Sequence, residues 1–415
     1  MLRVGPQRAA SLLAVLLWLR LVGELLVLSF TTEKRFVPVG QEAPSNATAG
    51  AVATGLTVAT IAVAGLLVLA NLNAATRVGL GRVGLFLLPW LYLLCRDAYA
   101  GHVERNAVVF ALIVLALAAL NPGVALFRTL AALTVLTAVI ALVLGIVAPE
   151  TALLRETTGE LRISDKALVP ALGLLQGPFT SENNLAQYLA LGLPSLVVLR
   201  RRAWRWTSVV LVLLAIGWSS SRSGLLTAGV VLAAGAVLAV LARRGWRRAV
   251  QLVALGLTAC LAAVGAVLPF LPWPPEAFTE RALIWQGTAG AWLSQDEVFG
   301  LGTQWFTEVG GTVTSPLNDA AYHAHNQFLQ LGATGGLLLV VLASVWLLAV
   351  TLLATDAGSP AQLPAALTVL AVVVSGYLEV PVGFVDRWAF WVVTSVPLAA
   401  AYFSAPRVFR WGGEG

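Results

Sequence analysis

"AYHAHNQFLQLGATGGLLLVVLASVWLLAV", residues 321–350, changes from polar to apolar within a few residues. It contains no Asp, Glu, Lys or Arg, and its apolar run continues to about residue 354. A run of about 20 apolar residues is long enough to cross the hydrocarbon core of a bilayer as a helix. The stretch therefore predicts a transmembrane helix over residues 325–354, with His323 and His325 at its polar end.

Similar apolar runs recur along the whole chain. Of its 415 residues, 59% are hydrophobic and 11% are charged, whereas about a quarter of the residues in a soluble domain are charged. The runs do not alternate apolar with polar residues as membrane β-barrels do. We therefore expect an all-α polytopic membrane protein, with residues 1–415 as a single integral membrane domain of about twelve transmembrane helices. The predicted spans are 9–30, 49–72, 82–96, 106–122, 128–148, 168–199, 206–220, 223–242, 249–271, 325–354, 361–381 and 388–404.

The charges between these spans predict how the protein lies in the membrane. Short loops rich in Lys and Arg favour the cytoplasmic side. One alternate set of connections holds the basic clusters Arg200–Arg205 and Arg243–Arg248, and the other set holds nearly every carboxylate. This alternation puts both termini in the cytoplasm and the acidic loops outside. The formal net charge of +6 thus reflects membrane orientation, and we expect no nucleic-acid partner.

The longest outer connection, residues 272–324, is too long for a bare loop. Within it, "TERALIWQGTAGAWL" is able to form a short helix near the membrane interface. Tryptophans are enriched at such interfaces, so we expect Trp285 and Trp292 to anchor this helix. The sequence therefore predicts one large outer loop with short interfacial helices.

The histidines stand where this loop enters the membrane. "SPLND" offers Asn318 as a helix cap, with Asp319 in the first turn. On a helix, residues two apart point in nearly opposite directions. We therefore expect His323 and His325 not to share a pocket. The alternative is that both are loop histidines in interfacial water.

His325 is predicted to lie over a closely packed helix seam. Gly332 and Gly336 follow it on one helical stripe, and small residues four apart let another helix approach closely. The positive end of the helix dipole favours a neutral imidazole at His325. A neutral imidazole can act as a base.

Two arginines at the outer ends of helices are candidate phosphate-binding residues. "WSSSRSGLL" places Arg222 between the seventh and eighth spans, where it either faces a cavity or snorkels to the headgroups. Arg281 lies in "ERALIW", where the alternative is a surface ion pair with Glu276 or Glu280. Guanidinium groups bind phosphate oxygens bidentately.

Other polar residues on the outer side are secondary candidates. Asn184 follows Ser181 in "GPFTSENNLAQYLALGLP", where a helix cap is also expected. Arg162 and Lys166 lie in the outer loop "RETTGELRISDK", for which a solvated loop is the default interpretation.

Cofactor and metal motifs are missing from the sequence. Cys95 and Cys260 show no metal-binding spacing. Asp296 and Glu297 form an acidic pair without a matching histidine. Glu24 and Glu379 stand isolated, unlike the carboxylate relays of proton-coupled transporters. We therefore predict no metal and no cofactor.

Four motifs in order resemble bacterial O-antigen ligases, which belong to the ligase and polymerase superfamily of lipopolysaccharide assembly. "HNQFLQLGATGG" resembles the family's histidine motif and supplies His325, Asn326 and Gly336. "SSSRSGLL" resembles its arginine-bearing segment. "RALIWQ" followed by "FGLGTQWF" resembles its arginine–tryptophan stretch, and the fourth similarity is the Asn-bearing helix upstream. Together the motifs cover residues 175–340, with departures at Thr334 and Leu339.

The resemblance implies a GT-C-like fold for lipid-linked glycosyl transfer with a large periplasmic loop. It implies a metal-independent, inverting transfer of glycan from undecaprenyl pyrophosphate to a sugar hydroxyl of lipid A–core. The reaction is expected in the periplasmic leaflet of the bacterial inner membrane, among membrane lipids. His325 is expected to take the acceptor proton, and Arg222 and Arg281 to hold the pyrophosphate. The secondary candidates are Arg162, Lys166, Asn184 and Asn326.

Other functions stay open at this stage. An O-antigen polymerase would use the same donor with a glycan acceptor, and a protein O-oligosaccharyltransferase would use a protein hydroxyl. A transporter or flippase for lipid-linked sugars belongs to a different class. A flippase needs no base, so replacing His325 with alanine separates it from the transferases.

Overall fold

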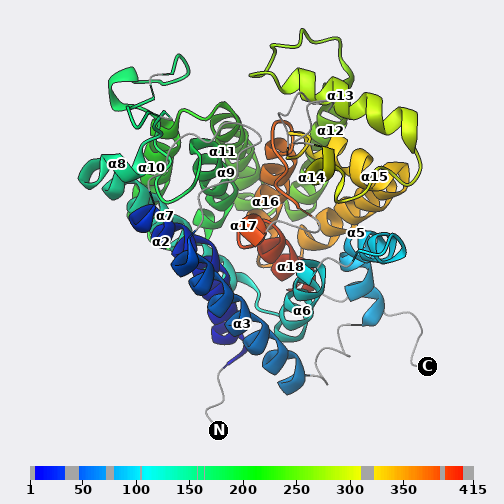
Figure 1. Ribbon diagram of the computed structural model, residues 1–415. Helices are drawn as coiled ribbons and strands as arrows, with labels where there is room; N and C mark the ends of the chain where they lie inside the picture. The colour runs from blue at the N-terminus through cyan, green and yellow to red at the C-terminus, as the bar shows by residue number, and fades with distance from the viewer. Residues whose placement is uncertain are drawn as a thin grey trace, which may run out of the picture.

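The computed structural model describes residues 5–32, 46–71, 79–102, 105–156, 158–162, 164–309, 322–383 and 388–404. These residues form a helical bundle (Figure 1). Within the described ranges, β structure is limited to two isolated bridges, Leu153 with Leu175 and Arg155 with Leu161. The prediction of an all-α protein is confirmed for this part of the chain.

The longer helices, with more than ten residues each, are α1 (Pro6–Trp18), α3 (Ala47–Ala70), α5 (Leu80–Tyr99), α6 (Arg105–Leu120), α7 (Val124–Val147), α9 (Glu182–Gly192), α10 (Arg202–Ser219), α11 (Arg222–Arg243), α12 (Arg247–Val267), α13 (Arg281–Gln295), α15 (Gln327–Ala354) and α16 (Gln362–Ser375). The shorter ones are α2 (Glu24–Thr31), α8 (Pro149–Ala152), α14 (Trp305–Val309), α17 (Trp388–Trp391) and α18 (Ser395–Ser404). A π-helical turn, η1 (Leu19–Gly23), joins α1 to α2, and 3₁₀ turns lie at η2 (Pro170–Leu172), η3 (Leu193–Val198) and η4 (Leu268–Phe270).

Six described segments are long and apolar enough to cross a membrane, judged by length and composition. They are Pro6–Thr31, Ala47–Ala70, Val124–Val147, Arg222–Arg243, Arg247–Phe270 and Gln327–Ala354. Each coincides with a predicted span. The structure therefore supports a multi-pass membrane protein, but it does not show twelve full spans.

Several predicted spans contain helices that are too short to cross. The 14 residues of α16 rise about 21 Å at 1.5 Å per residue, less than the roughly 30 Å of the hydrocarbon core. In the range 168–199, α9 has 11 residues and gives way to the 3₁₀ turn η3. Pro194 lies at the start of η3, where it lacks the N–H that an α-helix would use.

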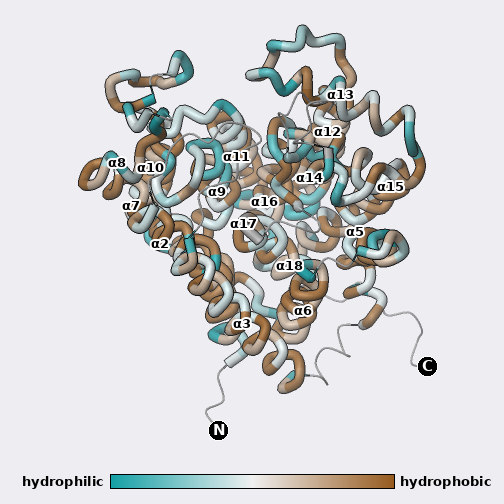
Figure 2. Tube along the Cα trace, viewed as in Figure 1, coloured by the Kyte–Doolittle hydropathy of each residue, from teal (hydrophilic) through white to brown (hydrophobic). Residues whose placement is uncertain are grey.

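The short helices form the centre of the bundle. α16 packs against α9, α11, α12 and α18, and nearly all of its side chains are buried. Helices that are apolar on all sides need this kind of environment. Two of the long spans are more exposed, with 17% of the α3 window and 22% of the α12 window buried, as lipid-facing helices should be. Figure 2 shows hydrophobic residues along the helices and hydrophilic residues gathered in the upper loops.

The connection between η4 and α15 contributes to a second, smaller apolar cluster. Trp285 on α13 is 0% exposed and Trp292 is 5% exposed, so the prediction that they anchor a helix at the interface is wrong. They pack with Trp305, Phe306 and Leu329. A Cβ atom at Gly332 would lie 2.4 Å from the Trp292 ring. The predicted close contact on α15 is therefore made with a tryptophan side chain of α13.

A kink in α15 provides hydrogen bonds to the segment that follows α13. Gly336 has φ +67°, which interrupts the helix and frees backbone groups on both sides. The segment 297–302 satisfies them with four backbone hydrogen bonds. These run from Leu337 N to Glu297 O (2.9 Å), Leu338 N to Val298 O (3.2 Å), Leu301 N to Ala333 O (2.6 Å) and Gly302 N to Thr334 O (3.2 Å).

Candidate functional site

Segments from six parts of the chain enclose a cavity of about 490 Å³. They are the first helix, the start of α9, the start of α13, the residues before α15, the segment after α16, and α17. The polar residues lining this cavity are Arg20, Glu24, Thr180, Ser181, Asn183, Asn184, Arg281, His323, His325 and Glu379. Of the predicted site residues, the cavity therefore brings together His325, Arg281 and Asn184.

His325 lies just before the helix and not on it. α15 begins at Gln327, and its cap is Asn326, whose Oδ1 accepts from the N–H of Phe328 (3.0 Å) and Leu329 (2.9 Å). His323 and His325 both line the cavity, with ring centroids 4.0 Å apart. The prediction that they cannot share a pocket is therefore wrong, because it assumed helical geometry. The cap predicted at Asn318, with Asp319, lies outside the described residues.

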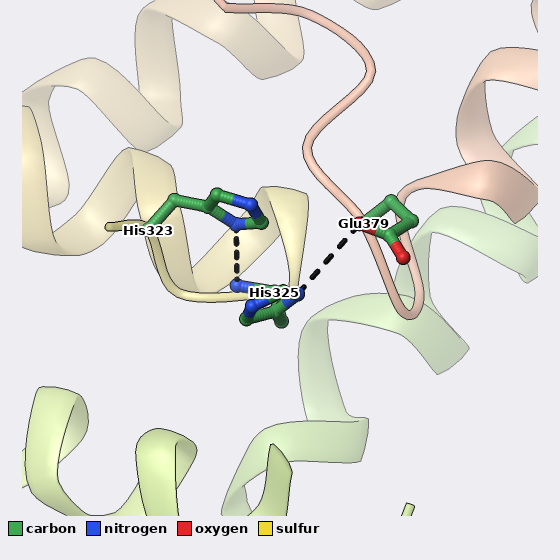
Figure 3. A group of neighbouring side chains, drawn as sticks. All are labelled: His323, His325 and Glu379. Atoms are coloured by element: carbon green, nitrogen blue, oxygen red, sulfur yellow. Dashed lines mark hydrogen bonds and ion pairs between the residues drawn. The ribbon is translucent and has the colours of Figure 1, made fainter. Parts of the chain in front are cut away.

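His323 supports the unusual backbone of His325. His325 has φ +49°, a left-handed conformation that costs a non-glycine residue about 1–3 kcal/mol. Its N–H donates to Nδ1 of His323 at 3.1 Å (Figure 3). Such strained residues cluster at active sites, and the His325 ring lies beside Glu379.

Glu379 joins His325 to Arg281. Its Oε2 lies 3.6 Å from His325 Nδ1 (Figure 3), and its Oε1 accepts from Arg281 Nη2 at 2.6 Å. Its side chain is only 6% exposed, and a buried carboxylate needs such partners. The prediction that Glu379 is isolated is wrong. Arg281 likewise pairs with a residue 98 positions away, and not with Glu276 or Glu280.

Asn326 acts beneath the cavity and does not line it. Its side chain is fully buried, and Nδ2 donates to the carbonyls of Gly265 (3.2 Å) and Tyr377 (3.1 Å). These bonds tie the start of α15 to α12 and to the segment that carries Glu379. Asn326 thus fixes the distance between His325 and Glu379.

Three other predicted residues lie outside the described lining of the cavity. Arg222 is exposed at the first position of α11. Arg162 pairs with Glu156 at 3.3 Å. Lys166 bonds to the buried Glu182 in the first turn of α9. Arg162 and Lys166 therefore hold the segment between α8 and α9 in this structure.

The sequence analysis missed Arg20 and Glu24 at the cavity wall. They bond to each other within the first helix, so the prediction that Glu24 is isolated is also wrong. An arginine and a glutamate four residues apart in an apolar span are a recognisable signal. Asn183 also lines the cavity, next to the predicted Asn184.

Three helices begin at the cavity. Ser181 caps α9 through a bond from Asn184 N (3.1 Å), Arg281 is the first residue of α13, and Asn326 caps α15. Each of these N-termini contributes partial positive charge. With Arg281, the cavity therefore suits a phosphorylated ligand.

His323, His325 and Glu379 are the group most able to hold a metal among the described residues. Their ligand atoms lie within 4.8 Å of one another, and two histidines with a glutamate are a ligand set that zinc uses. Arg281 already pairs with Glu379, and its positive charge opposes a second cation. The Oδ1 atom of Asp296 accepts from Phe299 N (2.9 Å) within a turn.

Comparisons with known proteins agree with the sequence motifs. A family model described as O-antigen ligase matches residues 207–344, about a third of the chain. The match includes Arg222, Arg281 and His325, and it ends before Glu379. A comparison with curated proteins finds no match. Residues 207–344 are therefore similar to the O-antigen ligase family, in agreement with the sequence motifs.

Proposed function

We propose that this protein is an O-antigen ligase. It transfers a glycan from undecaprenyl pyrophosphate to a sugar hydroxyl of lipid A–core, with inversion and without a metal. The reaction takes place in the periplasmic leaflet of the bacterial inner membrane. The observation that carries this proposal is the chain of contacts from Arg281 through Glu379 to His325 in one cavity.

His325 is the general base of the proposed reaction. Glu379 faces Nδ1, which leaves Nε2 to take the proton of the acceptor hydroxyl. The acceptor oxygen then attacks the anomeric carbon from the face opposite the pyrophosphate. The new C–O bond forms as the bond to pyrophosphate breaks, so the configuration inverts. The negative charge of Glu379 stabilises the imidazolium that results, as in carboxylate–histidine pairs.

Arg281 stabilises the departing pyrophosphate. One of its N–H groups donates to Glu379, and the guanidinium also lines the cavity. The N-termini of α13 and α15 add to the positive field where the leaving group gains charge. We propose that Arg222 contacts the donor outside the cavity, because α11 begins beside α9. There, Gly224 of α11 lies against Ala186 of α9.

The expected orientation supports a periplasmic reaction. The charge alternation assigns Arg20 to Leu25, Phe179 to Asn184, Arg281, His325 and Glu379 to the outer halves of their segments. All of them line the same cavity. A donor carried in the outer leaflet would reach it without crossing the membrane.

The test mixes purified protein with polyprenyl-pyrophosphate glycan and rough lipopolysaccharide, with EDTA present. We expect glycan-bearing lipopolysaccharide from the wild type and a loss of roughly 10²–10⁴-fold in rate for His325→Ala. The matched control is His102→Ala, which removes an exposed histidine outside the cavity. Undiminished transfer by His325→Ala would contradict the base.

The same assay separates the alternatives. Glycan that grows on the carrier instead of on lipopolysaccharide indicates a polymerase. Transport of lipid-linked sugar that survives His325→Ala indicates a flippase. A requirement for Mn²⁺, Mg²⁺ or Zn²⁺ would assign His323, His325 and Glu379 to a metal site.

A further inference from the structure

The first membrane helix brings a second ion pair to the cavity. Arg20 and Glu24 bond to each other and line the cavity, with 20% and 33% of their side chains exposed. Both lie inside the segment Pro6–Thr31, which is apolar enough to cross the membrane. Ionisable residues in such segments are costly and usually face a cavity or pathway. The transfer chemistry proposed above leaves this pair without a role.

The backbone around this pair is specialised. Arg20 lies in the π-turn η1 between α1 and α2, and π-turns inside α-helices are frequent at functional sites. From the neighbouring helix α3, Thr57 Oγ1 accepts a hydrogen bond from Arg20 Nε at 2.8 Å. Arg20 is thus held by Glu24 on its own helix and by Thr57 on the next. Side chains that merely snorkel to the headgroups do not need two such partners.

Both walls carry an arginine–glutamate pair, but they expose opposite partners. The guanidinium is the more exposed partner in the Arg281–Glu379 pair (14% against 6%), and the carboxylate is the more exposed partner in the Arg20–Glu24 pair (33% against 20%). A pyrophosphate would be repelled by the Glu24 carboxylate, whereas a sugar hydroxyl can donate a hydrogen bond to it. Asn183 and Asn184 line the same cavity, and their amides both donate and accept. This set suits an uncharged ligand that is rich in hydroxyl groups.

We infer that Arg20, Glu24, Asn183 and Asn184 form the subsite for the acceptor sugar. Glu24 accepts hydrogen bonds from its hydroxyls, and Arg20 fixes the position of Glu24. The inference rests on the proposed transfer reaction and adds the place where the acceptor is held. The pyrophosphate then occupies the part of the cavity near Arg281, where the guanidinium is more exposed than its carboxylate partner, with His325 between the two substrates.

Glu24→Gln tests this subsite, because it removes the charge and keeps the shape. We expect the KM for rough lipopolysaccharide to rise about tenfold, because the variant loses one hydrogen bond to a charged group. The KM for polyprenyl-pyrophosphate glycan and the kcat at saturating acceptor should stay within twofold of the wild type. Thr57→Val removes the second partner of Arg20. It should also raise the acceptor KM, but by less than Glu24→Gln does.

Glu156→Gln is the matched control. It breaks the Arg162–Glu156 pair, which lies outside the described lining of the cavity, and should leave all constants unchanged. The subsite would be overturned if Glu24→Gln raised the donor KM, lowered kcat or left the acceptor KM unchanged. A thermal melt of each variant shows that it is folded.

A binding measurement separates this inference from the transfer reaction. Rough lipopolysaccharide is titrated into wild type and Glu24→Gln in nanodiscs without donor. If the wild type transfers nothing, the proposed function fails, and the titration still decides the subsite. About tenfold weaker binding by Glu24→Gln supports it, and equal binding by the two proteins overturns it.

Discussion

Glu379 connects the two residues that the sequence motifs single out. It is 6% exposed and contacts Arg281 and His325 with different oxygens. A shared carboxylate couples the position of the base to the position of the phosphate-binding group. Movement of Arg281 toward a leaving group would then also change the environment of His325.

Glu379→Gln should lower kcat for glycan transfer by roughly 10²-fold, within the range for a general base. The amide oxygen can still accept from Arg281, but a neutral side chain cannot stabilise the imidazolium. Steady-state kinetics with both substrates measure this effect. Glu280→Gln is the control, because Glu280 is the neighbour of Arg281 in the sequence and is not among the residues that line the cavity. Wild-type kcat in Glu379→Gln would exclude the carboxylate from the reaction.

His323 should matter through its hydrogen bond and not through its own protonation. His323→Ala removes the acceptor of the His325 N–H, and we expect about a tenfold loss of kcat as the His325 backbone relaxes. In His323→Asn, the Oδ1 atom replaces Nδ1 as an acceptor, so activity should return to within about threefold of the wild type. Equal losses in the two variants, measured in the same transfer assay, would argue that the ring itself reacts.

Helices could be predicted from the sequence because apolar runs and charged loops mark their positions. The residues at which helices begin and end could not be predicted, and these ends determine which side chains meet in the cavity. Asn326 caps α15, so the helix starts after His325 and the two histidines meet. Glu379 follows α16, and nothing local in the sequence indicates that it lies beside Arg281. That contact depends on how α13, α15 and α16 pack together.

The kink of α15 makes a prediction at the scale of the element. A Cβ atom at Gly336 would lie 2.1 Å from the Val298 carbonyl oxygen, and its φ is +67°. Gly336→Ala should therefore destabilise the fold, by roughly 1–3 kcal/mol from the backbone strain alone. The apparent melting temperature in detergent, followed by tryptophan fluorescence, should fall. Transfer activity should fall with it, because segment 297–302 helps to position α13.

Gly256→Ala is the matched control for this element. Gly256 lies within α12, and a Cβ atom there meets nothing within 4 Å. The substitution should leave the melting temperature unchanged or raise it slightly, because alanine favours helices by up to about 1 kcal/mol over glycine. If the two alanine variants melt alike, the kink is not a constraint on the fold.

Across the whole molecule, short helices are more deeply buried than several of the long ones. Long apolar helices such as α3 and α12 are largely exposed, whereas the short helices α9, α16 and α18 are buried in the centre. A short central helix ends inside the protein, so its terminal groups and the following segment can reach a buried cavity. The start of α9 and the segment after α16 meet the cavity in this way.

The proposed orientation of the molecule makes the last prediction. Lys and Arg bias places the loop with Asp165 in the periplasm and the loop with Arg244 in the cytoplasm, and both side chains are exposed. Cys95 and Cys260 are also exposed, so both are first replaced with serine. In intact spheroplasts, a membrane-impermeant maleimide should label Asp165→Cys and should label Arg244→Cys only after permeabilisation. The reverse pattern would put the cavity on the cytoplasmic side, where a periplasmic ligase reaction is impossible.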